Sequence, residues 1–194
     1  MIAAVILAAG QSRRMGQPKL VLPWGKLTVI EHVITVFQSA GIEDILVVTG
    51  GARQQVENLL QSYSIRFIHN EEYENGEMLS SLQRGLRNMK SETWATLVGL
   101  GDQPQVQKST VRLVTETYRQ NRSALVVPSF EKRRGHPWLV ARPLWEELMS
   151  LRQPASPRDF LNNHSAEIDY VNVDTASILT DLDTPRDYDQ FRPL

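Results

Sequence analysis

The stretch LAAGQSRRMGQPK, residues 7–19, continues an apolar run that begins at Ala3. A short continuous apolar run followed by small residues is typical of a buried strand that ends in a turn. Three small residues come first and three basic residues follow: Ala8, Ala9 and Gly10, then Arg13, Arg14 and Lys19. Small residues let backbone amides approach anionic oxygens closely, and the basic residues supply countercharge. The stretch therefore predicts a polyphosphate-binding loop at the end of a buried strand.

Apolar runs of strand length recur along the chain, at residues 3–8, 44–49, 65–68, 94–100, 124–127 and 138–141. Helical spacing of apolar residues separates several of them, most clearly over 28–41 and 77–89. This alternation predicts one α/β domain over residues 1–194, a three-layer α/β/α sandwich with a mostly parallel, Rossmann-like sheet. Ligands of such sheets bind at the carboxyl ends of the strands, where the loop after residue 8 lies.

Composition excludes several classes of protein. With 21 basic and 22 acidic residues the formal net charge is −1, so we expect neither nucleic-acid nor membrane binding. The sequence has no cysteine, which excludes disulfides, thiolate metal sites and cysteine nucleophiles. The N-terminal apolar run is too short for a membrane span and lacks a basic leader, so the expected location is cytoplasmic.

Two common phosphate-binding patterns do not fit the loop. The Walker pattern places four residues between its glycines and then a lysine, whereas five residues separate Gly10 from Gly16, and Gln17 follows. The dinucleotide fingerprint fails because Ser12 occupies the place of its second glycine. A nicotinamide-dependent oxidoreductase is therefore disfavoured.

Carboxylates follow two other segments in a way that suits a metal ion. Asp102 comes after the apolar stretch 97–100 and between Gly101 and Pro104, where a strand is expected to end. A carboxylate there is placed to hold Mg²⁺ beside bound phosphates, although it is equally a candidate helix cap. Near the C-terminus, Asp183 precedes Thr184-Pro185 and is predicted to cap a helix, while Asp181 points the same way on an extended strand and is a candidate second metal ligand.

The loop resembles the signature LAAGxSxRMGxxK of the nucleotidyltransferase superfamily, which it matches at every fixed position. The resemblance implies the fold of nucleotide-diphospho-sugar transferases, with Arg14, Lys19 and Asp102 in catalysis and Mg²⁺ as cofactor. A similar DxGTP element in sugar nucleotidyltransferases favours Asp181 over Asp183 as the second metal ligand. The implied nucleotide-binding residues in the loop are Leu7, Ala8, Ala9, Gly10, Ser12 and Arg13.

Two further segments resemble parts of the molybdopterin nucleotidyltransferases. Residues 68–86 resemble their NxxWxxGxxxS segment, which implies base or ribose contacts from Asn70, Gly76, Ser80 and Ser81; the alternative is a loop that only begins a helix. The GHP turn at 135–137 resembles the acceptor side of the same enzymes. It implies acceptor-binding roles for Arg134 and His136, with solvated loop residues as the alternative.

Together, LAAG, QPKLVLPW, GDQP and GHP are similar to the cytidylyltransferase branch of the molybdenum-cofactor family. That resemblance implies transfer of CMP from CTP to the phosphate of molybdopterin, with release of pyrophosphate, and a molybdenum hydroxylase apo-enzyme as a partner. A guanylyltransferase is the nearest alternative, followed by another NTP transferase with a sugar- or alditol-phosphate acceptor. A non-enzymatic carrier of molybdenum cofactor stays open as a different class.

Overall fold

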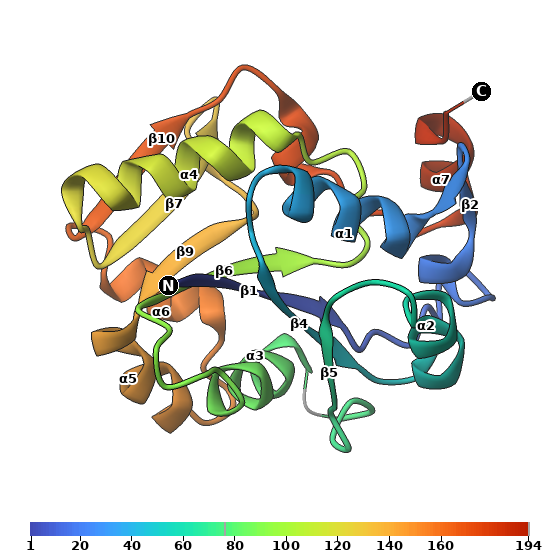
Figure 1. Ribbon diagram of the computed structural model, residues 1–194, viewed down its shortest axis with the longest axis horizontal. Helices are drawn as coiled ribbons and strands as arrows, with labels where there is room; N and C mark the ends of the chain where they lie inside the picture. The colour runs from blue at the N-terminus through green and yellow to red at the C-terminus, as the bar shows by residue number, and fades with distance from the viewer. Residues whose placement is uncertain (76, 194) are drawn as a thin grey trace.

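The computed structural model describes residues 1–75 and 77–193. Strands and helices alternate along much of the chain (Figure 1). The strands are β1 (Ile2–Ala8), β2 (Pro23–Trp24), β3 (Leu27–Thr28), β4 (Asp44–Thr49), β5 (Arg66–His69), β6 (Ala95–Leu100), β7 (Leu125–Phe130), β8 (Arg133–Arg134), β9 (Trp138–Ala141) and β10 (Ile168–Asn172). The α-helices are α1 (Val29–Ser39), α2 (Arg53–Leu59), α3 (Glu77–Arg87), α4 (Lys108–Asn121), α5 (Trp145–Ser150), α6 (Pro157–Asn163) and α7 (Pro185–Phe191), and short 3₁₀ turns are η1 (Lys19–Val21), η2 (Arg142–Leu144) and η3 (Ala176–Leu179).

The main sheet has the strand order β10-β7-β9-β6-β1-β4-β5, with β8 paired to β7. β1 lies between β4 and β6 and runs parallel to both, with Leu7 opposite Val48 on one side and Leu100 on the other. Among the described strands of this sheet, β9 and β8 run antiparallel to their neighbours. The predicted α/β fold with a mostly parallel sheet is confirmed.

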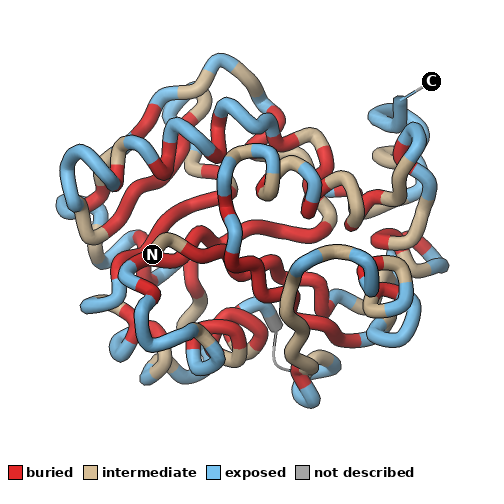
Figure 2. The backbone as a smooth tube through the Cα atoms, in the orientation of Figure 1, coloured by how far each residue is buried: buried red, intermediate tan, exposed pale blue. Residues whose placement is uncertain are grey.

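Helices cover both faces of this sheet, which buries its central strands completely (Figure 2). α1 and α4 pack on one face, where Phe37 and Val111 join a large apolar cluster. α3, α5 and α6 pack on the other face, where Leu82 and Phe160 belong to a second cluster. Strands buried on both faces need the continuous apolar runs seen in the sequence, because neither face meets water.

The two predicted helices form close to their expected bounds. The pattern over 28–41 gives α1, which Thr28 caps in a reciprocal pair with Glu31 and which Gly41 follows with φ +92°. The pattern over 77–89 gives α3. No helix within the described residues is long and apolar enough to cross a membrane.

The carboxyl ends of β1, β4 and β6 meet at one edge of the sheet, and close backbone approaches hold them together. The amide of Gly101 donates to the carbonyl of Leu7 at 2.9 Å. A Cβ on Gly50 would lie only 2.3 Å from the carbonyl oxygen of Ala9. A side chain at Gly50 would push the backbone of Ala9 away, so glycine is required there, where the loop after β1 begins.

Gly85 offers a test of how tightly α3 packs on the sheet. A Cβ there would lie 2.7 Å and 3.0 Å from the two methyl groups of Val5. Glycine to alanine inside a helix ordinarily stabilises by about 0.5–1 kcal/mol, but overpacking costs about 1–3 kcal/mol. We therefore expect Gly85→Ala to lower the free energy of unfolding, measured by urea denaturation. Gly10→Ala, whose Cβ meets nothing within 4 Å, is the matched control. A more stable Gly85→Ala protein would contradict this packing.

Candidate active site

The loop after β1, residues 9–18, is held in shape by Ser12. The amides of Met15 and Gly16 donate to the carbonyl of Ser12 at 3.0 and 3.1 Å, and Met15 is buried beneath the loop. Ser12 itself has a left-handed backbone, with φ +52°. Its hydroxyl accepts a hydrogen bond from the amide of Lys19 at 3.1 Å, which ties the end of the loop to its beginning.

The inner side of this loop lines a cavity of about 340 Å³, here called the loop cavity. Predicted nucleotide-binding residues on its wall are Leu7, Ala8, Gly10, Ser12 and Arg13. Besides Arg13, five charged residues of both signs line it: Arg14, Lys19, Glu74, Asp102 and Asp183. A second cavity of about 470 Å³ lies against other parts of the same loop and extends to Gly51 and Tyr73. Loop and charges therefore meet at the carboxyl edge of the sheet, as predicted.

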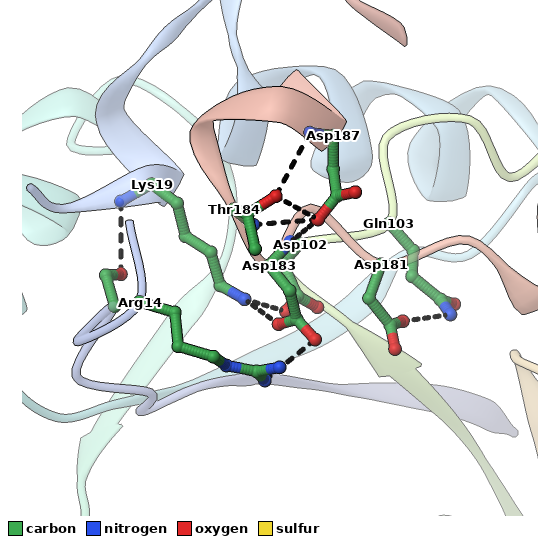
Figure 3. A network of polar contacts seen from close by, with 9 residues as sticks. Arg14, Lys19, Asp102, Gln103, Asp181, Asp183, Thr184 and Asp187 are labelled. Atoms are coloured by element: carbon green, nitrogen blue, oxygen red, sulfur yellow. Dashed lines mark hydrogen bonds and ion pairs between the residues drawn. The ribbon is translucent and has the colours of Figure 1, made fainter. Parts of the chain in front are cut away.

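Lys19 points its ammonium nitrogen at two neighbouring carboxylates (Figure 3). The nitrogen lies 2.5 Å from Asp102 Oδ2 and 3.0 Å from Asp183 Oδ1. Arg14 Nη2 contacts the other oxygen of Asp183 at 2.8 Å. Burial works against the charged ammonium, but the two carboxylates outweigh it and raise the pKa of Lys19. Of the three basic residues predicted to supply countercharge to phosphate, Arg14 and Lys19 are thus paired with carboxylates in this structure.

Asp102 faces the loop cavity from the end of β6 and does not cap a helix, because the N-cap of α4 is Gln107. The carbonyl of Asp102 accepts a hydrogen bond from the amide of Leu182 at 3.1 Å. Leu182 is completely buried, so residues 181 and 183 on either side of it are turned toward the opposite side, near Asp102. The C-terminal segment is thereby brought next to the end of β6.

Asp181 is held by Gln103, which follows Asp102 in the chain. Gln103 is 3% exposed, and its Nε2 donates to Asp181 Oδ1 at 2.7 Å (Figure 3). Although Asp181 stays open to solvent on one side, partial loss of water and the nearby charge of Asp102 raise the pKa of its carboxyl. Two carboxylates that repel each other in this way form a place where a cation is favoured.

The structure corrects the cap predicted for the last helix. The N-cap of α7 is Thr184, not Asp183: the Thr184 hydroxyl accepts from the amide of Asp187, and Asp187 accepts from Thr184 in return. The threonine hydroxyl and the carboxylate three residues later form a capping box, for which Asp183 is one residue too early. Asp183 is therefore free of the capping role and pairs with Arg14 and Lys19.

Residues predicted to bind the base come together, but they contact one another. Asn70 is 3% exposed and its Nδ2 donates to the hydroxyls of Ser80 and Ser81 at 2.9 and 3.0 Å. This arrangement ties the end of β5 to the first turn of α3. Gly76 lies outside the described residues. Base recognition by this segment stays a prediction.

A larger cavity, of about 1040 Å³, lies beside β7, β8 and α6 and is here called the basic cavity. Its wall carries the basic side chains Lys132, Arg133, Arg134 and Arg158. Both residues of the predicted acceptor site line it, because Arg134 and His136 face it from β8 and the turn that follows. A cavity of this size holds a ligand of several rings, and its excess positive charge favours an anion.

Arg134 is positioned by two partners, since its Nε donates to Tyr170 Oη at 2.8 Å and its Nη1 to Asn162 Oδ1 at 2.9 Å. The guanidinium also lies over the Tyr170 ring, 5.5 Å from its centre. Burial lowers the pKa of His136 to about 4, so its imidazole is neutral at neutral pH. His136 therefore offers the cavity a hydrogen-bonding ring rather than a charge.

The C-terminal segment joins the two cavities. Leu179 lines the basic cavity and Asp183 lines the loop cavity, with Asp181 between them in the chain. A segment of five residues, 179–183, therefore links the linings of the two cavities.

Sequence reasoning missed several residues of the site: Gln103, Arg158, Asn162 and Tyr170. Tyr170 and Asn162 have no local signal, because they lie on a late strand and a short helix that only the fold brings to Arg134. A signal for Gln103 exists in hindsight, since it directly follows the candidate ligand Asp102.

The MobA-like NTP transferase domain model matches residues 4–168 of this chain. The chain belongs to that family. It is accordingly a nucleotidyltransferase, which agrees with the phosphate loop, the carboxylates and the basic cavity.

Individual relatives carry different names. The chain is similar to a molybdenum cofactor cytidylyltransferase of Escherichia coli (strain K12), 27% identical over 96% of this chain and 93% of the relative. It is also similar to a nicotine blue oxidoreductase of Paenarthrobacter nicotinovorans, 28% identical over 94% of this chain and 92% of that protein. Among solved structures, a manganese complex of Rv0371c from Mycobacterium tuberculosis H37Rv superposes with a TM-score of 0.84, at 25% identity over 98% of this chain and 97% of that one. These names leave the substrate of this chain unspecified.

The capping box of α7 can be tested by stability. We expect Thr184→Ala to lower the free energy of unfolding by about 1 kcal/mol, because it leaves helix amides without their acceptor. Thr184→Ser keeps the hydroxyl and is the matched control. Urea denaturation of both variants measures the difference. Equal stability of the alanine variant and the unmodified protein would show that Thr184 does not cap this helix.

Proposed function

We propose that this nucleotidyltransferase moves CMP from CTP to the phosphate of molybdopterin-type cofactor, with Mg²⁺ bound by Asp102 and Asp181. The observation that carries the proposal is the arrangement of the two cavities. A loop with backbone amides and basic residues lines one of them, a large basic cavity lies nearby, and the segment 179–183 runs between the two.

The loop cavity suits the triphosphate of a nucleotide. The small residues of the loop would let backbone amides approach anionic oxygens closely, and Arg13, Arg14 and Lys19 add positive charge. Arg13 is exposed and its Nε contacts only the neighbouring Gln11, at 2.7 Å, among the hydrogen bonds described for it. Its charge is therefore ready to meet a phosphate without first breaking an ion pair.

The donor set fits a hard divalent ion such as Mg²⁺ or Mn²⁺ rather than zinc or copper. Carboxylate oxygens from Asp102 and Asp181 are hard ligands, and no group of three or more histidine, cysteine or acidic residues in the described chain is arranged to hold a metal alone. Mg²⁺ is commonly held by one or two carboxylates together with substrate phosphates and water. Partial loss of water and, next to it, the charge of Asp102 raise the pKa of Asp181, and a bound cation would stabilise both carboxylates.

The basic cavity suits a large acceptor that ends in a phosphate. Its aromatic and aliphatic walls accommodate a ring system, and Arg134 is already oriented by Tyr170 and Asn162. A guanidinium fixed in this way binds phosphate with little loss of conformational freedom. Neutral His136 adds a hydrogen-bonding group to the same wall.

The chemistry requires alignment and charge neutralisation more than proton transfer. An oxygen of the acceptor phosphate forms a bond to the α-phosphorus of CTP, the bond from that phosphorus to the bridging oxygen breaks, and pyrophosphate leaves with the electron pair. Phosphate is already ionised at neutral pH, so no general base is needed. The metal neutralises charge on the phosphates when bound, while the basic side chains orient the reacting groups.

Support for CTP comes from two directions, the resemblance of LAAG, GDQP and GHP to the cytidylyltransferase branch and the name of a relative that spans nearly the whole chain. A product carrying CMP then suits delivery to a molybdenum hydroxylase apo-enzyme. GTP is the alternative nucleotide.

Pyrophosphate release tests the reaction. The protein is incubated with Mg²⁺, molybdenum cofactor and each of the four ribonucleoside triphosphates, and we expect release with CTP. Asp102→Asn keeps the size of the side chain but removes its charge, and should reduce kcat by about 100-fold or more. Glu116→Gln, on the exposed surface of α4, is the matched control. Release with GTP alone would move the proposal to a guanylyltransferase, and no release with any triphosphate would contradict it.

Arg134 tests the acceptor side. We expect Arg134→Met to raise KM for molybdenum cofactor by about tenfold or more, because a charge-assisted hydrogen bond contributes about 1.5–3 kcal/mol. KM for CTP should change little, since the nucleotide contacts the other cavity. Arg119→Met, on the exposed surface of α4, should leave both constants unchanged. An equal rise in both KM values would place Arg134 outside the acceptor site.

A further inference from the structure

The environment of Lys19 points to a role that phosphate binding does not explain. We propose that, without nucleotide, the Lys19 ammonium, which is paired with Asp102 and Asp183, takes the place of the divalent cation at Asp102 and keeps free metal out. Metal then binds when a nucleotide triphosphate draws Lys19 away. This inference rests on the proposed function, because it concerns the same metal and the same triphosphate.

The geometry is that of an occupied cation site. The ammonium contacts two neighbouring carboxylates, that of Asp102 at the end of β6 and that of Asp183 before α7 (Figure 3). Lys19 is 8% exposed, so little water competes with these contacts. Asp102 is also the carboxylate assigned to Mg²⁺. The Lys19 ammonium therefore lies against the carboxylate that Mg²⁺ needs.

The two cations cannot share Asp102 at low cost. A divalent ion within bonding distance of Asp102 would lie close to the ammonium, and like charges at about 4 Å repel by about 1 kcal/mol per unit-charge pair in water and several times more near protein. In the ligand-free protein, Asp102 and Asp183 together are already partly neutralised by Lys19 and Arg14. Their attraction for a free metal is correspondingly weak.

A triphosphate provides the force that moves the side chain. The backbone of Lys19 is tied to Ser12 and begins η1, so only its flexible side chain has to turn. The loop cavity is lined by Ser12, Arg13 and Lys19. The Lys19 ammonium can therefore contact the oxygens of a triphosphate bound there while it stays inside the cavity. Once Lys19 turns to the phosphates, Asp102 loses its neutralising partner and can bind the metal together with Asp181.

This exchange makes the two ligands cooperative. If nucleotide raises the affinity for metal by some factor, metal must raise the affinity for nucleotide by the same factor. The protein would thus take up metal and nucleotide together and hold little metal otherwise. Both ligands favour the same position of the Lys19 side chain, the one turned away from Asp102.

The test measures binding of Mn²⁺, followed by the electron paramagnetic resonance signal of the free ion. Without nucleotide, we expect Lys19→Met to bind Mn²⁺ about tenfold more tightly or better than the unmodified protein, because the competing charge is gone. Lys19→Arg keeps the charge and should bind Mn²⁺ as weakly as the unmodified protein. Lys26→Met removes an exposed lysine and is the matched control for net charge. Unchanged Mn²⁺ affinity in Lys19→Met would overturn the inference.

A second arm separates this inference from the proposed function. The unmodified protein is titrated with Mn²⁺ in the presence of the α,β-methylene analogue of CTP, which cannot transfer its nucleotidyl group. Tight Mn²⁺ binding that Asp102→Asn abolishes would support the metal site. If this arm succeeds while Lys19→Met shows no gain without nucleotide, only the role of Lys19 fails. If this arm shows no Mn²⁺ binding, the proposed metal site fails with it.

Loss of Lys19 leaves two carboxylates without their partner, so folding has to be checked separately. Lys19→Gln, which keeps a polar head without charge, is the second variant. Thermal unfolding with and without Mn²⁺ gives an independent readout, because a ligand that binds the folded state raises Tm. We expect Mn²⁺ to raise Tm more for Lys19→Gln than for the unmodified protein. An equal rise in both would count against the inference.

Discussion

The pairing of β1 with β4 on one side and β6 on the other is the constraint on which the rest of the structure depends. All three strands are parallel and buried, so their carboxyl ends are forced to one edge of the sheet. At that edge the backbone of Ala9 lies against Gly50, and Gly101 donates to Leu7. The start of the phosphate loop is therefore positioned by the packing of the sheet, and the charged residues of the loop follow from that position.

Much of the fold could be predicted from the sequence because the central strands are buried on both faces. Such strands must be apolar throughout, and 44–49 and 138–141 were predicted with the observed bounds. β10 was not predicted, because as an edge strand it mixes buried and exposed residues. The antiparallel direction of β9 also has no sequence signal, since periodicity reports burial and not strand direction.

Some parts of the candidate site have a local sequence pattern, and others depend on contacts between residues far apart in the chain. The loop 7–19 and Asp102 could be found because each carries its own pattern directly after an apolar run. The pairing of Arg14 with Asp183 joins residues 169 positions apart, and that of Gln103 with Asp181 joins residues 78 apart, so neither has a local signal. The prediction that Asp183 caps the last helix was wrong for the same reason, because its actual partners are distant in the sequence. Thr184 and Asp183 both suit an N-cap by residue type, and the distant lysine and arginine give Asp183 a different partner.

The charges of the site are held in place by a hydrophobic contact. Leu182 is completely buried, and its amide donates to the carbonyl of Asp102. In an extended segment, burying the middle residue turns both neighbours the other way, so one leucine orients Asp181 and Asp183 together. Partial loss of water and repulsion by the nearby carboxylate of Asp102 raise the pKa of Asp181, which reflects the cost of this position. Burial of an aliphatic side chain contributes about 1.5–3 kcal/mol, enough to keep like charges in a position that a cation then stabilises. Apolar packing thus creates an excess of negative charge, which Lys19 balances in the ligand-free protein.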